Sequence, residues 1–177
     1  MLEHEIGVTY GLLAALAFSL AAFFYKKGFL DSQPDVFVAN GLRAVPTFVL
    51  LLILNLSLGD LTKLLEGNAV LYAFFSIFSD LVIGDTCFFL ALREAPLSLV
   101  YPISYSFSIF ASIFSYFFLK ESITVNLVSS IMALILGIYL VYGDRSGSAS
   151  IKGIIYSILT AFFWGLSTVF TRLGLYY

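Results

Sequence analysis

The stretch GVTYGLLAALAFSLAAFFYKKGF (Gly7–Phe29) recurs 146 positions later as GIIYSILTAFFWGLSTVFTRLGL (Gly153–Leu175). The small residues, a central aromatic residue and a terminal cation followed by glycine all recur in register. The identical pairs are Gly7/Gly153, Tyr10/Tyr156, Leu13/Leu159, Ala15/Ala161, Leu20/Leu166, Phe24/Phe170 and Gly28/Gly174. Apolar helices often match by chance, so the placement of these residues supports a repeat more than their number does. The sequence therefore predicts one whole structural unit and the opening of a second.

Composition places the chain in a membrane. Of its 177 residues, 60% are hydrophobic and 11% are charged. A soluble protein of this length has too little interior to bury so much apolar surface. A helix of about 20 residues crosses the ~30 Å hydrocarbon core. Six apolar runs have suitable lengths: Val8–Tyr25, Val36–Leu58, Ala69–Leu92, Leu97–Leu119, Ile123–Tyr142 and Gly153–Thr171. We expect an all-α, polytopic membrane helix bundle of six transmembrane helices, multi-pass in the cell membrane and surrounded by the lipid bilayer.

The loosest connection between these helices is Gly143–Lys152, whose Gly-Ser-Ala-Ser composition is typical of a flexible linker. We expect the first five-helix repeat at residues 1–145, a linker at 146–152, and the first helix of an incomplete second repeat at 153–177. An odd number of spans before the linker makes the second unit enter the membrane in the opposite sense, which gives an inverted repeat. Because two periods of 146 residues exceed the chain, we expect either a fragment or a natural truncation.

Several short motifs occur in a fixed order along the chain. An arginine, Arg43, stands in FVANGLRAVP, and GDTCFFLALREAP is followed by Val-Tyr-Pro. The turn FFLKESIT keeps Glu121 but has Lys120 before it. Together with the repeated opening helix, this order resembles the EamA type of the drug/metabolite transporter superfamily. That family has Leu-Gly-Glu-x-x-Thr at the last of these turns, so Lys120 replaces its glycine.

The resemblance implies ten helices in two five-helix repeats, with this chain ending after the first helix of the second. It also implies an integral membrane transporter of small metabolites, a secondary active exporter or importer. Binding sites in such folds form between the two repeats. An alternative is a non-transporting membrane scaffold or assembly subunit that needs a partner half. The partners expected are therefore a small-molecule solute and either a second copy of the chain or a complementary half.

Ionisable residues inside the spans are the leading site candidates, because charge is rare and costly at membrane depth. Asp80 is central in Ala69–Leu92 and is a candidate carrier of a coupling proton or cation. In a regular α-helix Asp85 would lie about 140° around from Asp80, so the two acids would not share a face. Arg43 and Asp85 lie at similar depths, about 8 and 10 Å from one side, and we expect them to form an ion pair. The rival is that Arg43 reaches back to the lipid headgroups.

The fourth span supplies polar aromatic residues. Tyr101 and Tyr105 are one turn apart and offer both a stacking face and a hydroxyl. Ser104, Ser108 and Ser112 follow an adjoining stripe, and we expect most of these serines to bond back to their own helix. If the tyrosines line the solute path, the solute is small and partly apolar or zwitterionic.

Small residues at Gly7, Gly11, Ala15 and Ser19 recur every four positions on the first helix. Such a ridge allows another helix to approach closely. Pro46 and Pro102 lie inside the second and fourth spans, where each removes a backbone hydrogen bond and favours a kink. We therefore expect a tightly packed bundle with irregular helices.

Other classes of function find little support. The sequence Val82-Ile-Gly-Asp85 is one residue away from the Gly-x-Gly-Asp of intramembrane aspartyl proteases, and no other span carries a second aspartate. There is no His-Glu-x-x-His, so we expect neither an enzyme nor a bound metal or cofactor. A net charge of −2 without a basic run gives no surface for nucleic acid.

Overall fold

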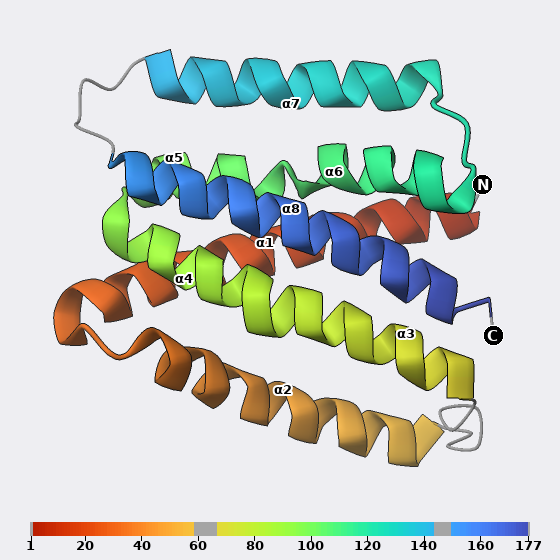
Figure 1. The fold of residues 1–177 in the computed structure, drawn as a ribbon, viewed down its shortest axis with the longest axis horizontal. Coiled ribbons are helices and arrows are strands. Elements are labelled where there is room, and N and C mark those ends of the chain that lie inside the picture. Colours follow the sequence, from red (N-terminus) through yellow and green to blue (C-terminus); the bar gives the residue numbers. More distant parts are fainter. Residues whose placement is uncertain (1, 59–66, 144–149, 177) are drawn as a thin grey trace.

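The computed structural model describes residues 2–58, 67–143 and 150–176, and these residues form helices joined by short turns (Figure 1). The elements are α1 (Leu2–Ser32), α2 (Val36–Leu58), α3 (Gly67–Ile77), η2 (Phe78–Gly84), α4 (Asp85–Glu94), α5 (Leu97–Tyr105), α6 (Phe107–Phe114), η3 (Ser115–Leu119), α7 (Val125–Gly143) and α8 (Ile151–Gly174). The segments η2 and η3 are π-helical. The expected all-α membrane helix bundle is confirmed.

Six helical stretches correspond to the six expected spans. Five of them are long and apolar enough to cross a membrane: Ile6–Ser32, Val36–Leu54, Gly67–Glu94, Leu97–Leu119 and Ile151–Gly174. The sixth is α7, which contains a shorter apolar stretch at Val125–Gly137. The third span is continuous through α3, η2 and α4, and the fourth runs through α5, α6 and η3. Of the expected linker at 146–152, residues 146–149 lie outside the described residues, and α8 begins within it at Ile151.

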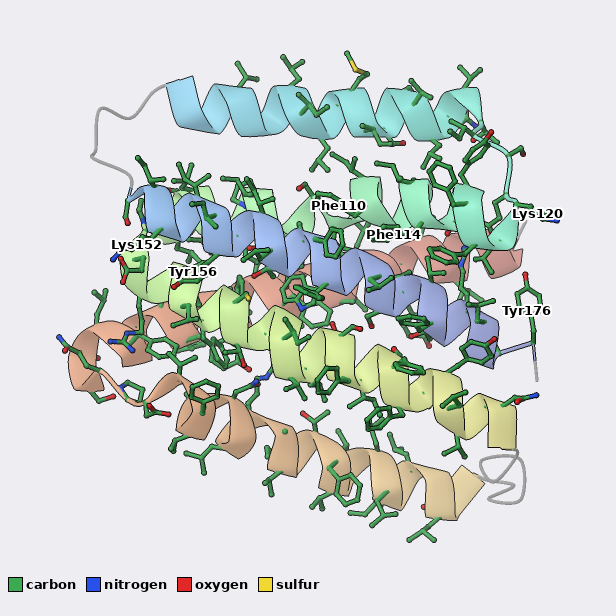
Figure 2. The ribbon with its side chains drawn as sticks, viewed as in Figure 1. Phe110, Phe114, Lys120, Lys152, Tyr156 and Tyr176 are labelled. Carbon is green, nitrogen blue, oxygen red and sulfur yellow. The ribbon has the colours of Figure 1, made fainter. Side chains whose placement is uncertain are left out.

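Helix α8 occupies the middle of the bundle. It packs against α3, η2 and α4 on one side and against α5 and α6 on the other (Figure 1). Phe110 and Phe114 of α6 pack against Phe162 of α8, with ring centroids 5.7 and 5.3 Å apart (Figure 2). In the apolar window of α8, 39% of the residues are buried, compared with 6% in α1. The two copies of the repeated helix therefore have opposite surroundings.

Glycines allow this central packing. A Cβ atom on Gly153 would lie 2.5 Å from the Ala95 Cβ atom, and one on Gly165 would lie 2.6 Å from the Phe110 Cβ atom. The repeat partner of Gly153 is Gly7, and neither Gly7 nor Gly11 has a described neighbour within 4 Å of an added Cβ atom. The expectation of close packing on the ridge of α1 is therefore wrong at Gly7 and Gly11, whereas Gly153 and Gly165 on the equivalent ridge of α8 make such contacts.

The irregular points of the spans differ from the expected proline kinks. Pro46 lies within the continuous helix α2. The fourth span is instead interrupted at Ser106, four residues after Pro102, where α5 ends and α6 begins. The Ser106 hydroxyl bonds to the Ile103 carbonyl at 2.6 Å, which satisfies part of the broken turn. The third span is irregular at η2, where neither proline lies.

The fourth span ends on a residue with a left-handed backbone. Lys120 has φ 54° and ψ 29°, and its N–H donates to the Ser115 carbonyl. Side chains with a Cβ atom disfavour this conformation, whereas glycine adopts it freely. This geometry explains why a glycine suits the position that Lys120 takes in this chain.

Replacing Lys120 by glycine is expected to stabilise the fold by about 1 kcal/mol, because the left-handed backbone then has no Cβ atom to accommodate. The measurement is thermal unfolding in detergent, followed by circular dichroism. Lys120→Ala is the matched control, since it removes the charge but keeps the Cβ atom. Equal melting of the glycine and alanine variants would contradict the prediction.

Candidate functional site

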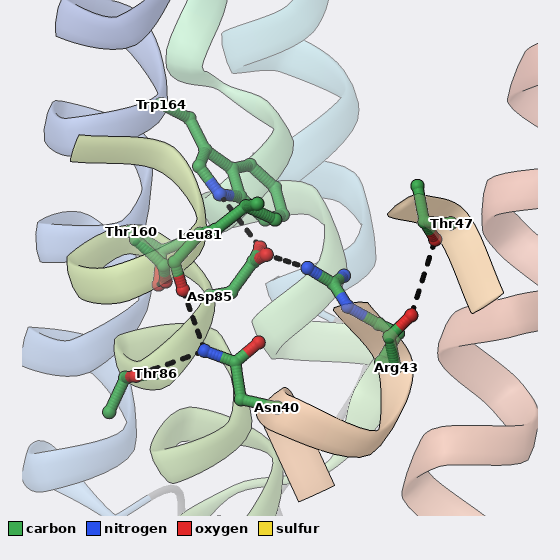
Figure 3. Close-up of polar contacts among 9 residues, drawn as sticks. Asn40, Arg43, Thr47, Leu81, Asp85, Thr86, Thr160 and Trp164 are labelled. Carbon is green, nitrogen blue, oxygen red and sulfur yellow. Dashed lines mark hydrogen bonds and ion pairs between the residues drawn. The ribbon is translucent and has the colours of Figure 1, made fainter. Parts of the chain in front are cut away.

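An ion pair lies between the second and third spans. Arg43 of α2 pairs through Nη2 with Oδ2 of Asp85, the first residue of α4 (Figure 3). The side chain of Asp85 is 4% exposed and that of Arg43 is 24% exposed. The predicted pairing is confirmed, and Arg43 does not reach back toward the headgroups. A buried pair of this kind holds α2 and α4 together because each charge would be costly alone.

The other carboxylate oxygen of Asp85 is bound by α8. The indole Nε1–H of Trp164 donates to Asp85 Oδ1 at 3.1 Å (Figure 3). Gly84 makes room for the ring, since a Cβ atom there would lie 2.6 Å from the Trp164 Cδ1 atom. One turn earlier on α8, the Thr160 hydroxyl donates to the Gly84 carbonyl at 3.3 Å. Asp85 of α4 is therefore bound from α2 by Arg43 and from α8 by Trp164.

Sequence reasoning missed Trp164 as a functional residue. Trp164 is the central aromatic residue of the second copy of the repeat and corresponds to Phe18 in the first. The difference between the two side chains was the available clue, because an indole carries an N–H donor and a phenyl ring does not. Asn40 was also missed: its Nδ2 donates to the Leu81 carbonyl at 2.6 Å and to Thr86 Oγ1 at 3.3 Å. Asn40 thereby fixes α2 to the π-helical turn.

The π-helix changes the relation between the two acids. The Asp85 N–H donates to the Asp80 carbonyl, five residues back. Residues joined in this way lie on adjacent turns, much as positions i and i+4 do in an α-helix. The expectation that Asp80 and Asp85 face different sides assumed a regular α-helix and is therefore wrong. Asp80 is half-buried, and Arg43 lies close enough to act on it electrostatically.

The two candidate tyrosines form one aromatic stack. The rings of Tyr101 and Tyr105 lie 4.1 Å apart at an interplanar angle of 23°. The Tyr101 hydroxyl hydrogen-bonds with the Ser19 hydroxyl of α1 at 2.9 Å. Tyr105 meets the edge of Trp164 at 5.3 Å and 77°. The stack therefore connects α1 and α5 to the indole that binds Asp85.

The serines of the fourth span differ in their surroundings. Ser112 bonds back to the Ser108 carbonyl at 2.6 Å, as expected for a serine within its own helix. Ser108 is exposed, whereas Ser104 is completely buried. The structure therefore brings together Arg43 with Asp80 and Asp85, and through Trp164 adds the tyrosine stack.

A second polar region lies at the opposite end of α8. A hollow of about 280 Å³ between α6, α7 and α8 is lined by hydroxyls such as those of Ser115 and Thr168. At its rim Arg172 forms an ion pair with Glu121. Both residues belong to motifs of the sequence. Arg172 is the repeated terminal cation, and Glu121 belongs to the turn after the fourth span. Both side chains are exposed, so this pair contributes little to stability.

Comparison with known proteins agrees with this architecture. Residues 5–143 match the EamA-like transporter family. The chain is 27% identical over 158 residues to an uncharacterized transporter of Archaeoglobus fulgidus, an overlap that covers 88% of this chain and 55% of that protein. The chain thus spans about half the length of the curated relative that it matches. No solved structure matches it. The chain belongs to the EamA-like transporter family, of the drug/metabolite transporter type, and is a multi-pass integral membrane protein.

Proposed function

We propose that the chain forms part of a secondary active transporter of small metabolites in the cell membrane. The observation that carries the proposal is Asp85, which is held by Arg43 from α2 and by Trp164 from α8. A charge network that joins the first unit to the opening helix of the second has the position expected of a transporter site. Arg43, Asp85, Tyr101 and Tyr105 line the proposed path of a solute that is partly apolar or zwitterionic. The family implies solute movement, so no enzymatic reaction is assigned.

The proposed organisation is an inverted repeat with a first unit at 1–145, a linker at 146–152 and the opening helix of a second unit at 153–177. The family match over residues 5–143 and the start of α8 at Ile151 support these bounds. The burial of α8 within the first unit also supports them, because repeats in such folds share their binding region. A complementary half or a second copy of the chain would complete the site. A monomer of residues 1–177 is therefore expected to bind solute without transporting it.

Two irregular points lie beside Trp164. The π-helical turn η2 ends at Gly84, against the indole, and the break at Ser106 lies between two neighbours of the indole, Tyr105 and Phe107. Non-helical backbone at membrane depth is tolerated where it is buried in protein or lines a cavity. π-Helical turns are also frequent at functional sites. We assign bending during the transport cycle to these two points.

Asp80 is the proposed carrier of the coupling proton. The variant Asp80→Asn should abolish the solute-dependent movement of protons and retain solute binding and exchange, because asparagine keeps the shape and removes the charge. The measurement uses proteoliposomes that contain the chain together with a complementary half, are loaded with a pH-sensitive dye and receive a pool of small amino and carboxylic acids. Asp31→Asn, at the exposed end of α1, is the control. Unchanged proton movement in Asp80→Asn would assign Asp80 to structure.

The second candidate is a non-transporting scaffold or assembly subunit. The exposure of α1 and α2 favours it, since only 6% of each apolar window is buried and both present wide apolar faces. The same proteoliposomes separate the two functions. A scaffold would give no solute-dependent flux in any variant, even when a complementary half is present.

A further inference from the structure

The guanidinium group of Arg43 is only partly covered by its neighbours. Two aromatic rings lie on the same side of it, with its Cζ atom 5.9 Å from the Tyr25 centroid and 5.5 Å from the Phe89 centroid, and the two centroids 5.2 Å from each other. Asp85 pairs with Nη2, and the side chain remains 24% exposed. Arginine carries several N–H donors in a planar fork that matches a carboxylate edge-on. The pairing through Nη2 and the partial exposure thus leave N–H donors of Arg43 for a second planar anion.

Asp85 has a second hydrogen-bond partner, which would hold its carboxylate if the ion pair with Arg43 were broken. Its Oδ1 atom accepts the Trp164 indole hydrogen bond, and this contact does not depend on Arg43. We propose that Arg43 binds the carboxylate of a small organic anion, which displaces Asp85 from the ion pair while one proton enters the Asp80–Asp85 pair. Asp85 then acts as an internal substitute for the solute when the site is empty. This inference rests on the proposed transport function and names its solute class and its coupling ion.

The uptake of one proton with each anion is inferred from the charges of the buried groups. With both acids ionised, Arg43, Asp80 and Asp85 together carry one negative charge, so an added carboxylate would leave the buried region with two uncompensated negative charges. Such added charge is costly at membrane depth unless it is neutralised. A proton taken from the aqueous side onto the two acids returns the total charge to its value before the anion bound. Because Asp80 and Asp85 lie on adjacent turns, the proton belongs to the pair and not to one residue.

The elements around Asp85 bring a limited set of titratable and charged groups. Helix α8 contributes only uncharged partners there, Trp164 and Thr160. The groups on the other elements packed around this region are Tyr25 and Lys26 on α1, Arg43 on α2, Asp80 on η2, Cys87 on α4, and Tyr101 and Tyr105 on α5. Lys26 donates to the carbonyls of Leu92 and Ala95 at the other end of α4. Substitution of Asp80 or Asp85 therefore tests whether a proton binds to these two acids together with the anion.

The stacked rings of Tyr101 and Tyr105 would contact the part of the solute beyond its carboxylate. Tyr105 lies close enough to Arg43 for an electrostatic interaction, and Tyr101 stacks on it. An apolar or aromatic body attached to the carboxylate would lie against these rings. Trp164 contacts both Asp85 and Tyr105, and it is the single tryptophan of the chain. Its fluorescence therefore reports directly on the site.

The test titrates the purified chain in detergent with sodium benzoate and follows Trp164 emission. Benzoate should change the emission saturably, whereas benzamide and benzylammonium, which keep the ring and alter the charge, should not. If one proton accompanies each anion, the Kd should rise about tenfold from pH 7 to pH 8. Arg43→Lys should weaken binding about tenfold, because lysine lacks the planar fork. Arg43→Gln should abolish binding.

Asp85→Asn separates displacement from a purely structural role. Without the competing carboxylate, benzoate should bind more tightly than to the wild type at pH 8, and with a weaker dependence on pH. Circular dichroism of each variant checks that the helices are intact. Benzoate binding that is independent of pH, equal binding of benzamide, or no response from the wild type would each overturn the proposal. If Asp80→Asn loses proton movement but the wild type does not bind benzoate, the proposed transport function stands. The proposal that the solute binds Arg43 through a carboxylate is then refuted.

Discussion

Reversing the charge of either Arg43 or Asp85 is expected to destabilise the bundle by more than the ~3–5 kcal/mol that removal of one member of a buried ion pair costs. Arg43→Asp would place a new carboxylate against Asp85, with Asp80 one turn away. Asp85→Arg would place two guanidinium groups together and turn a cation toward the Trp164 N–H. The double variant restores opposite charges and should recover a large part of the loss. Thermal unfolding in detergent, followed by Trp164 emission and circular dichroism, measures the difference.

The neutral variants Arg43→Gln and Asp85→Asn are the controls for charge. Each leaves one buried ion without its partner but adds no repulsion, so each should fall between the wild type and its charge-reversed counterpart. Recovery in the double variant should be incomplete, because an arginine at position 85 cannot accept the Trp164 hydrogen bond. If the loss in the double variant equals the sum of the two single losses, the pair does not contribute to stability.

Gly153→Ala is expected to destabilise the fold by about 1–3 kcal/mol, the usual cost of forcing an extra methyl group into a packed interface. The new Cβ atom would meet Ala95 Cβ at 2.5 Å, Ala95 N at 3.2 Å and Glu94 C at 3.3 Å. Two of these three atoms belong to the backbone, so a change of rotamer cannot relieve the contact. We therefore expect α8 to move away from the end of α4.

The repeat supplies a matched control for this variant. Gly7→Ala introduces the same methyl group at the equivalent position of α1, where no described atom lies within 4 Å of it. Alanine favours a helix over glycine by about 1 kcal/mol, so this variant should be neutral or slightly stabilising. Similar melting temperatures for the two variants would mean that α8 does not pack against α4 in solution as it does here.

Much of the fold could be predicted because membrane insertion depends on the length and polarity of each segment. The apolar runs identified the six helices, and the depth of Arg43 and Asp85 identified their pairing. The π-helical turn could not be predicted, since one residue of extra winding leaves the apolar pattern of the span unchanged. That turn decides that Asp80 and Asp85 lie on adjacent turns.

The central position of α8 could not be predicted from the sequence either, because α1 and α8 carry nearly the same small-residue ridge. Which copy is buried depends on the shape of the surface that α3 to α6 present, and that surface is a tertiary property. The Trp164 bond to Asp85 follows from the same placement. Local sequence therefore predicted the contact between α2 and α4 and missed the contact that α8 adds.

The central position of α8 has a consequence for the order of synthesis. Helices α3 to α6 precede α8 in the sequence, so they leave the ribosome before the helix against which they pack. Until α8 arrives, the Ser76 hydroxyl lacks Ser167 and Thr171, which it meets at 3.0 and 2.7 Å, and Asp85 lacks the Trp164 N–H. Such groups need other partners in the meantime, whether water, lipid headgroups or the insertion machinery. The early helices must therefore stay loosely associated until α8 has been inserted. Only then can the bundle pack fully.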